Sequence, residues 1–264
     1  MVATKPDIAN LISWWAFDEA SGVRYDAHGS NNLADTGTVG YAAGKISNAA
    51  DFVRASTDYV DIADNASLST GDIDFTLITW IYLDDDTNLQ DFWTKASSGA
   101  SGDVEYTLRY DNGADRFSFV VGGSGYNTVD ADNLGAPSTG TWYQIIAWHD
   151  STANTINIQV NNGVVDSVGS VSPPNDTAGN MTIGQDHINA GRALDGRMDE
   201  TIFAKRVYTS GEREWFWNSG DGRAYSELSA IGGIAEINGV AWASIAEVNG
   251  VAVASIAEVS GVEN

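Results

Sequence analysis

The sequence contains no cysteine and few basic residues. Without cysteine the chain has no disulfide bond and no thiolate metal site. The chain has only 13 Lys and Arg but 36 Asp and Glu, which gives a formal net charge of −23. Because so acidic a chain repels phosphate backbones, we expect no nucleic-acid partner.

Long apolar runs are also missing. No stretch approaches the roughly 20 apolar residues that a membrane-spanning helix needs. The first residues, MVATKPDIANL, lack the basic segment and apolar run of a signal peptide. We therefore expect synthesis in a cytoplasm without export, and no membrane partner.

Proline is scarce (4 residues), whereas there are 28 glycines and nine tryptophans, a mixture typical of many strands joined by tight turns. The segment DFTLITWIYLD (74–84) alternates with two apolar faces, which predicts a central strand. The segments 104–111 and 116–123 flank NGAD and predict a hairpin. One short helix is expected near 210–218, with Ser210 as its cap and Gly220 as its end.

These patterns predict an all-β, two-sheet antiparallel sandwich over residues 1–228. Several segments also follow one another in an order typical of one family: LISWWAFDEASG, YDAHGSNN, GKISNAADFVRASTDYVDIAD, DFTLITWIYLD, MTIGQD and LDGRMDETIFAKRVYTSGE. Over about residues 10–220 the chain resembles laminin-G-like domains of the concanavalin A-like lectin/glucanase superfamily. The resemblance implies a jelly roll that binds glycans or proteins.

A calcium site is the first candidate. YDAHGSNN places oxygen donors around a glycine, as a hard cation requires. The resemblance implies a structural Ca²⁺ held by Asp26 and Asn32 of this loop together with Asp199 of GRMDE. His28 and Ser30 depart from the family pattern. The alternative is that Asp26 and Asn32 only form Asx turns.

Glycan binding is the second candidate. Sugars stack on exposed aromatic rings and form hydrogen bonds with polar side chains. Three segments combine such residues outside the clearest strand patterns: LQDFWTK, GGSGYNT and GQDHINAGR. The predicted ligand-binding residues are Trp93, Tyr126, Asn127, Asp186 and His187.

Catalysis is the least favoured candidate. A glycoside hydrolase needs two carboxylates on either side of the scissile bond. The nearest arrangement is Asp195, Asp199 and Glu200 in LDGRMDETIF. Adjacent residues of a strand point to opposite faces, so Asp199 and Glu200 are not expected to act as a pair. We expect no enzymatic activity.

Residues 229–264 form a separate segment with an eleven-residue repeat that restarts at Ile234, Ile245 and Ile256. In one alternative, strands are joined by Asn-Gly type I′ turns. In the other, a Ser-x-x-Glu capping box begins a helical turn that a short strand follows. A disordered tail is a third alternative, which the apolar content disfavours.

The repeats are too small to bury their own apolar side chains. We therefore expect assembly through them, with other proteins or as a homo-oligomer, preferably a trimer. The predicted assembly residues are Ile234, Ile237, Val240, Trp242, Ile245, Val248, Val251, Val253 and Ile256.

Short Ile-x-x-Ile-Asn-Gly-Val repeats resemble those at the ends of bacteriophage structural proteins. This resemblance implies a non-enzymatic virion component (a fibre, decoration or tail protein) that displays a lectin-like domain to cell-surface glycans. The alternative is an extracellular carbohydrate-binding module or adhesin.

Removal of residues 229–264 should leave a folded monomer that no longer assembles, because the repeats supply the apolar contact between partners. Sedimentation velocity of the full and truncated chains measures this. A truncated chain that assembles like the full chain would contradict the prediction.

Overall fold

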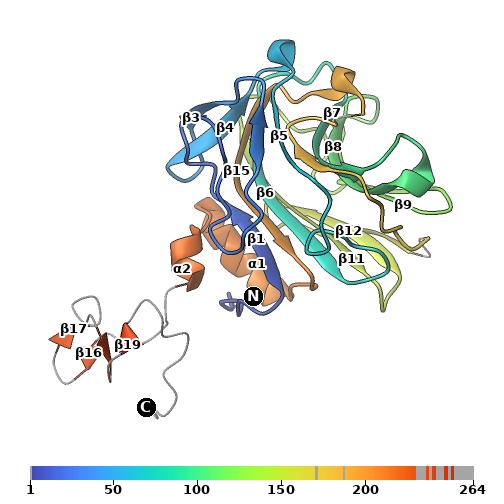
Figure 1. Cartoon of the computed structure of the whole chain (residues 1–264). Helices are drawn as coiled ribbons and strands as arrows, with labels where there is room; N and C mark the ends of the chain where they lie inside the picture. Colours follow the sequence, from blue (N-terminus) through green and yellow to red (C-terminus); the bar gives the residue numbers. More distant parts are fainter. Residues whose placement is uncertain are drawn as a thin grey trace.

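The computed structural model describes residues 2–169, 172–186 and 188–229, and four two-residue strands further on. The predicted all-β sandwich is confirmed: two antiparallel sheets lie face to face (Figure 1). Strands far apart in the sequence lie side by side within each sheet, in the manner of a jelly roll.

The first sheet has eight strands. Its spatial order is β13 (Asp166–Gly169), β12 (Thr155–Val160), β11 (Trp142–Asp150), β6 (Phe75–Leu83), β15 (Gly196–Ala204), β4 (Asn48–Phe52) and β3 (Gly40–Ala43). The remaining strand, β1 (Leu11–Trp15), also pairs with β15.

The second sheet has seven strands. Its spatial order is β10 (Tyr126–Asp130), β9 (Arg116–Gly122), β8 (Val104–Asp111), β7 (Gln90–Ala96), β14 (Met181–Ile183), β5 (Tyr59–Ile62) and β2 (Ala34–Thr36). The predicted hairpin is confirmed, since Asp111 of β8 pairs with Arg116 of β9. Short 3-10 turns lie in the connections: η1 (Arg54–Ser56), η2 (Ser101–Asp103), η3 (Ala190–Arg192) and η4 (Asn218–Gly220).

The core fills the space between the sheets with aromatic side chains. Trp15 of β1 meets Trp93 of β7 edge to face, with ring centroids 5.9 Å apart. Phe203 of β15 stacks on Tyr106 of β8 at 6.0 Å. Such pairs add about 1 kcal/mol each to the gain from apolar burial. The inner faces of the two sheets therefore hold the sandwich together.

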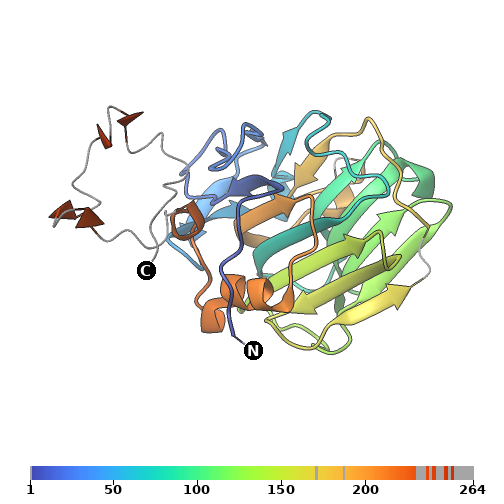
Figure 2. The same ribbon diagram turned by 90° about the horizontal axis from the view of Figure 1, so that it is seen from below.

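A second apolar layer lies on the outward face of the eight-stranded sheet. There Trp14 and Ile78 are buried beneath Trp215 and Phe216 of helix α1 (Ser210–Trp217), which lies against this sheet (Figure 2). This layer explains why both faces of β6 are apolar. The seven-stranded sheet instead has an outward face that carries the pocket described below.

The helix begins and ends one or two residues away from the predicted positions. Thr209, and not Ser210, caps α1, because its side chain and that of Glu212 form a reciprocal capping box. Asn218, in the left-handed conformation at φ 49°, ends the helix before Gly220. A second helix, α2 (Tyr225–Ser229), was not predicted; it has five residues and buries Leu228.

Four short strands lie in the repeats. β16 (Glu236–Ile237) pairs with β17 (Val240–Ala241), and β18 (Glu247–Val248) pairs with β19 (Val251–Ala252), each across an Asn-Gly position. This pairing is that of the hairpin alternative. The side chains of all nine predicted assembly residues lie outside the described residues.

One buried ion pair lies where β7 ends and β8 begins, in the middle of the seven-stranded sheet, and joins these strands to nearby loops. Lys95 Nζ lies 2.5 Å from Glu105 Oε1 and 2.7 Å from Asp64, and the side chains of Lys95 and Glu105 are fully buried. Lys95 also donates to the carbonyls of Thr177 and Gly179. Both neighbours of Lys95 on β7 line the pocket described below.

Glu105→Ala should lower the free energy of unfolding by about 3 kcal/mol, because it leaves part of a buried ammonium uncompensated. Urea denaturation measures this. Asp132→Ala is the control, since Asp132 pairs with Arg116 at 3.2 Å on the surface and should leave the unfolding midpoint unchanged. Equal effects of the two substitutions would contradict the role of the buried pair.

Candidate functional site

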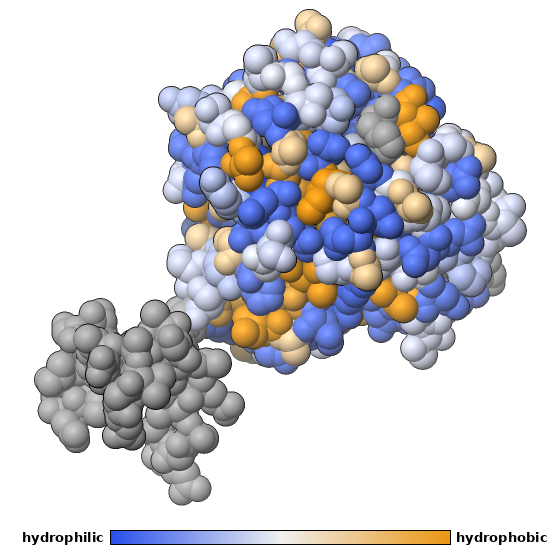
Figure 3. Space-filling model, in the orientation of Figure 1, coloured by the Kyte–Doolittle hydropathy of each residue, from blue (hydrophilic) through white to orange (hydrophobic). Residues whose placement is uncertain are grey.

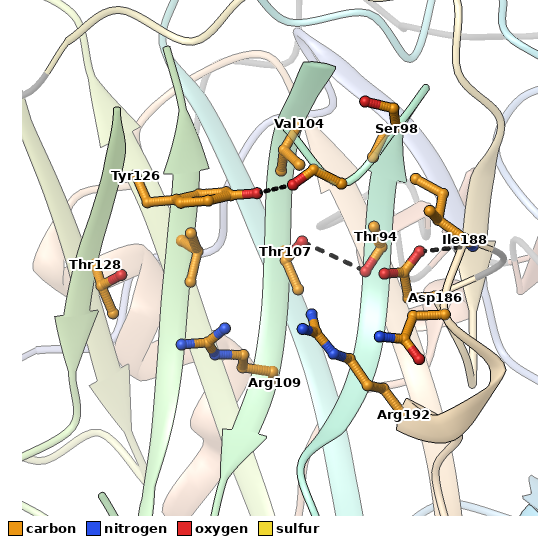
Figure 4. Close-up of a pocket in the computed structure, with 14 residues that line it drawn as sticks. Thr94, Ser98, Val104, Thr107, Arg109, Tyr126, Thr128, Asp186, Ile188 and Arg192 are labelled. Atoms are coloured by element: carbon orange, nitrogen blue, oxygen red, sulfur yellow. Dashed lines mark hydrogen bonds between the residues drawn. The ribbon is translucent and has the colours of Figure 1, made fainter. Parts of the chain in front are cut away.

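A pocket of about 290 Å³ lies on the outward face of the seven-stranded sheet. Its floor is a row of side chains from four adjacent strands, and cross-strand pairing places them level with one another. The row consists of Thr94, Thr107, Val120 and Thr128. Three hydroxyl groups and one apolar side chain thus face the cavity (Figure 4).

Tyr126 lies at one end of this pocket. It is the first residue of β10, just after the glycine-rich turn from β9, and its side chain is 54% exposed. The hydroxyl group donates to the carbonyl of Gly99 across the pocket mouth, which fixes the ring (Figure 4). A held and exposed aromatic ring suits stacking on an apolar ligand face.

The opposite rim is a tight loop that leads into η3. Asp186 Oδ1 accepts the amide of Ile188 at 2.9 Å, and the Asp186 carbonyl accepts the amide of Asn189 at 3.0 Å. Asp186, Ile188, Asn189 and Arg192 line the pocket from this side. The loop therefore presents a carboxylate, an amide and a guanidinium to one cavity.

Two guanidinium groups lie at the end of the pocket away from Tyr126 (Figure 4). Arg109 of β8 is directly opposite Asp91 of β7 in the ladder, and Arg192 lies 3.5 Å from Asp91 Oδ2. Burial raises the pKa of Asp91 to about 6, with Arg192 and Arg109 opposing the shift and Asp186 adding to it. One buried carboxylate thus lies next to two arginines.

Two other hollows lie on the described surface. The larger, of about 580 Å³, lies beside Asp64, Asp176 and Lys205, and its lining in the described chain contains no aromatic side chain. The other lies at Asn133 and Val164. Because ligand sites combine an aromatic or apolar wall with a few convergent polar groups, the pocket at Tyr126 is the favoured site.

The predicted ligand-binding residues divide into three groups. Tyr126 and Asp186 both line the pocket. The prediction for Trp93 is wrong: its side chain is fully buried against Trp15, because it points into the sandwich. Asn127 points away from the pocket lining and hydrogen-bonds with Ser172 instead. His187 lies outside the described residues.

The predicted calcium ligands are engaged by the backbone. Asp26 Oδ1 accepts the amides of Trp14, His28 and Gly29 at 2.9–3.0 Å, and Oδ2 accepts that of Asn31. Asn32 Oδ1 in turn accepts the amide of Asp26 at 2.9 Å. This is the Asx-turn alternative, in which the carboxylate orders the loop.

Asp199 bonds elsewhere, since its Oδ2 accepts the amide of Ile46 at 2.8 Å. Within the described ranges no three acidic or histidine side chains form a group that could hold a metal ion. The side-chain contacts described for Asp26, Asn32 and Asp199 are hydrogen bonds from backbone amides. Calcium binding stays a prediction.

Asp199 and Glu200 lie on the same side of the sheet, contrary to the prediction of opposite faces. A bulge in β15 with Glu200 at φ 44° reorients the chain. Asp199 pairs with Trp80, which stacks on Trp217, and Glu200 accepts the indole N–H of Trp14 in the layer beneath α1. Both carboxyl groups are buried. A pair of carboxyl groups that acts on a substrate must be accessible to it.

Comparison with known families decides the classification. Residues 54–212, more than half of the chain, match the family Laminin_G_3, described as the concanavalin A-like lectin/glucanases superfamily. The chain belongs to this superfamily. A search of curated proteins found no match.

Solved structures with a similar fold were also found. Domain 4 of AbnA, a GH43 extracellular arabinanase from Geobacillus stearothermophilus in complex with arabinotriose, is similar with a TM-score of 0.61 at 16% identity, over 77% of this chain and 96% of that one. The binding domain of Paraclostridial Mosquitocidal Protein 1 gives 0.63 at 14% identity, over 80% and 52%.

A sialidase from Trypanosoma rangeli gives a TM-score of 0.58 at 13% identity, over 84% of this chain and 35% of that one. This chain therefore spans about half of the toxin domain and about a third of the sialidase. At these identities the likeness shows the fold. Among the described residues, no helix has the length and apolar character to span a membrane.

Sequence reasoning missed the arginines and the floor of the pocket. Alternation in VEYTLRYD would have placed Thr107 and Arg109 on the face opposite to Leu108. Arg192, 83 positions further along, reaches the pocket only through the pairing of β14 with β7. No local pattern marks such a long-range contact.

The free energy of unfolding should fall as the pH rises through the pKa values of Asp199 and Glu200. Burial raises their pKa values to about 8 and about 9, and for Glu200 the neighbouring Asp199 adds to the shift. Because these folded-state values exceed those of the unfolded chain, the stabilisation is complete below about pH 4 and is lost as pH rises to about 9. Glu200→Gln should flatten this dependence.

Denaturation in a chelator-containing buffer at several pH values measures this effect. Asp132→Asn is the matched control, since it removes an exposed carboxylate and should leave the pH dependence unchanged. An identical pH dependence of the wild type and Glu200→Gln would contradict the assignment.

Proposed function

We propose that this domain is a non-catalytic carbohydrate-binding module whose sugar site is the pocket beside Tyr126. The observation that carries the proposal is a fixed, exposed tyrosine ring over a cavity lined with hydroxyl, carboxylate, amide and guanidinium groups. Sugars combine apolar ring faces with hydroxyl groups that donate and accept, and this lining complements both.

The comparisons support a binding role. The similar arabinanase domain was solved in complex with arabinotriose, and the similar toxin segment is named a binding domain. Both are named as domains of larger proteins. By analogy, this module supplies attachment rather than chemistry.

The arrangement of carboxylates supports a non-enzymatic role. Hydrolysis of a glycosidic bond requires two carboxyl groups on opposite sides of the bond. Only one carboxylate, that of Asp186, belongs to the described lining of the pocket. Asp199 and Glu200 lie buried beneath the helical layer instead.

The module belongs, in this proposal, to a bacteriophage virion and attaches or oligomerises through residues 229–264, preferably as a trimer. The repeated apolar sequence and the short hairpins of the repeats support an attachment segment. The alternative is an extracellular adhesin, which the similarity to toxin binding domains favours. Recovery of the protein in purified virions distinguishes the two.

Tyr126→Ala should weaken sugar binding about tenfold or more, since it removes the stacking surface. A glycan array identifies the sugar, and isothermal titration then compares the variants. Tyr41→Ala is the matched control: Tyr41 of β3 is 55% exposed, similar to the 54% of Tyr126, but belongs to the other sheet.

The two variants must retain the wild-type melting temperature for the comparison to count. Equal losses of affinity in both variants, or none in Tyr126→Ala, would refute the pocket as the sugar site.

A further inference from the structure

The arginines of the pocket have more hydrogen-bond donors than the protein uses. A guanidinium carries five N–H donors. Among the described residues, Arg109 donates only to Asp111, at 2.9 Å, and its Nε has no partner. Arg192 donates only to Asp91, at a long 3.5 Å, and its side chain is 38% exposed.

Other arginines of the chain have mainly structural contacts. Arg24, for example, is buried and donates to the carbonyls of Glu19, Val39 and Gly40, although its Nε has no partner among the described residues. Arg213 donates to Gln159 and to the carbonyl of Tyr208 and packs over Trp148. What distinguishes Arg109 and Arg192 is that both line the same cavity and that the described residues use only part of their donors.

We propose, on the basis of the proposed carbohydrate-binding function, that the pocket selects sugars bearing an anionic oxygen group, a carboxylate or a sulfate, which Arg109 and Arg192 bind. Neutral sugar hydroxyls both donate and accept, whereas a guanidinium only donates. An anionic group only accepts, and its oxygens match the fork of a guanidinium. The sugar ring would lie toward Tyr126, at the other end of the cavity (Figure 4).

The neighbouring carboxylates are already engaged. Asp111 accepts from Arg109 and from two backbone amides of its turn, and Asp186 Oδ1 accepts the amide of Ile188. Asp130 lies further out on β10, where it accepts from Ser118. The described lining contains Arg109, Arg192 and one carboxylate, that of Asp186, whereas Asp111 and Asp91, which pair with the two arginines, lie outside the lining.

Asp91 provides a counter-charge to these two arginines. It is buried, it faces Arg109 from β8, Arg192 from η3 and Asp186 from the preceding loop, and its Oδ1 has no partner in the described part of the chain. Its raised pKa means that it gains a proton as the pH falls through about 6. Protonation removes the counter-charge of the arginines, so binding of an anionic sugar should strengthen toward pH 5.

Matched neutral and anionic sugars test the proposal on the full chain. Titration calorimetry compares galactose with galacturonate and galactose 6-sulfate, and glucose with glucuronate. At least one anionic sugar should bind about tenfold more tightly than its neutral counterpart. Binding of the carboxylate alone would assign the site to uronic acids, and binding of the sulfate alone would assign it to sulfated sugars.

Substitutions assign the preference to residues. Arg109→Gln and Arg192→Gln should each reduce the affinity for the anionic sugar about tenfold, a larger loss than for the neutral sugar. Asp91→Asn should raise the affinity for the anionic sugar at pH 7.5 and abolish its pH dependence. Arg116→Gln, the control, removes a half-buried cation that pairs with Asp132 outside the pocket lining.

The outcomes separate this inference from the proposed function. Equal affinity for neutral and anionic sugars, with binding still lost in Tyr126→Ala, would overturn the anionic preference and leave the sugar site standing. A preference that survives both arginine variants would also overturn it. Absence of binding by any sugar on a broad array would overturn both proposals.

Discussion

The packing of two apolar sheet faces against each other is the constraint on which the rest of the structure depends. Because strand residues alternate, the burial of Tyr106 and Leu108 in the core obliges Thr107 and Arg109 to face outward. The same alternation on the neighbouring strands aligns the floor of the pocket. The core thus determines which side chains are available to a ligand.

The outward faces of the two sheets have different roles because different elements lie against them. On the eight-stranded sheet the outward face is apolar and is sealed by Trp215 and Phe216 of α1. On the seven-stranded sheet the outward face is polar, and the loops near Ser98 and Asp186 surround a cavity instead of filling it. Figure 3 shows one face of the described body, which is mainly hydrophilic with scattered apolar areas.

The fold could be predicted from the sequence because it depends on local patterns. Alternation identified β6, and the turn residues between β8 and β9 identified their hairpin. Tyr126 and Asp186, which both line the pocket, could be selected as candidates because glycine and polar neighbours marked their segments. Trp93 was misassigned because its polar neighbours suggested an exposed position. The sequence does not indicate which face of the strand its side chain is on. The bulge at Glu200 and the approach of Arg192 depend on tertiary pairing, which no local pattern encodes.

The central claim is that the outward face of the seven-stranded sheet holds the sugar. Chemical-shift mapping of backbone amides during titration with a bound oligosaccharide tests it most directly. The account predicts that the largest shifts fall on Thr94, Thr107, Val120 and Thr128 and on the loop after Asp186. Shifts concentrated around Asp64 and Asp176, beside the larger hollow, would contradict it.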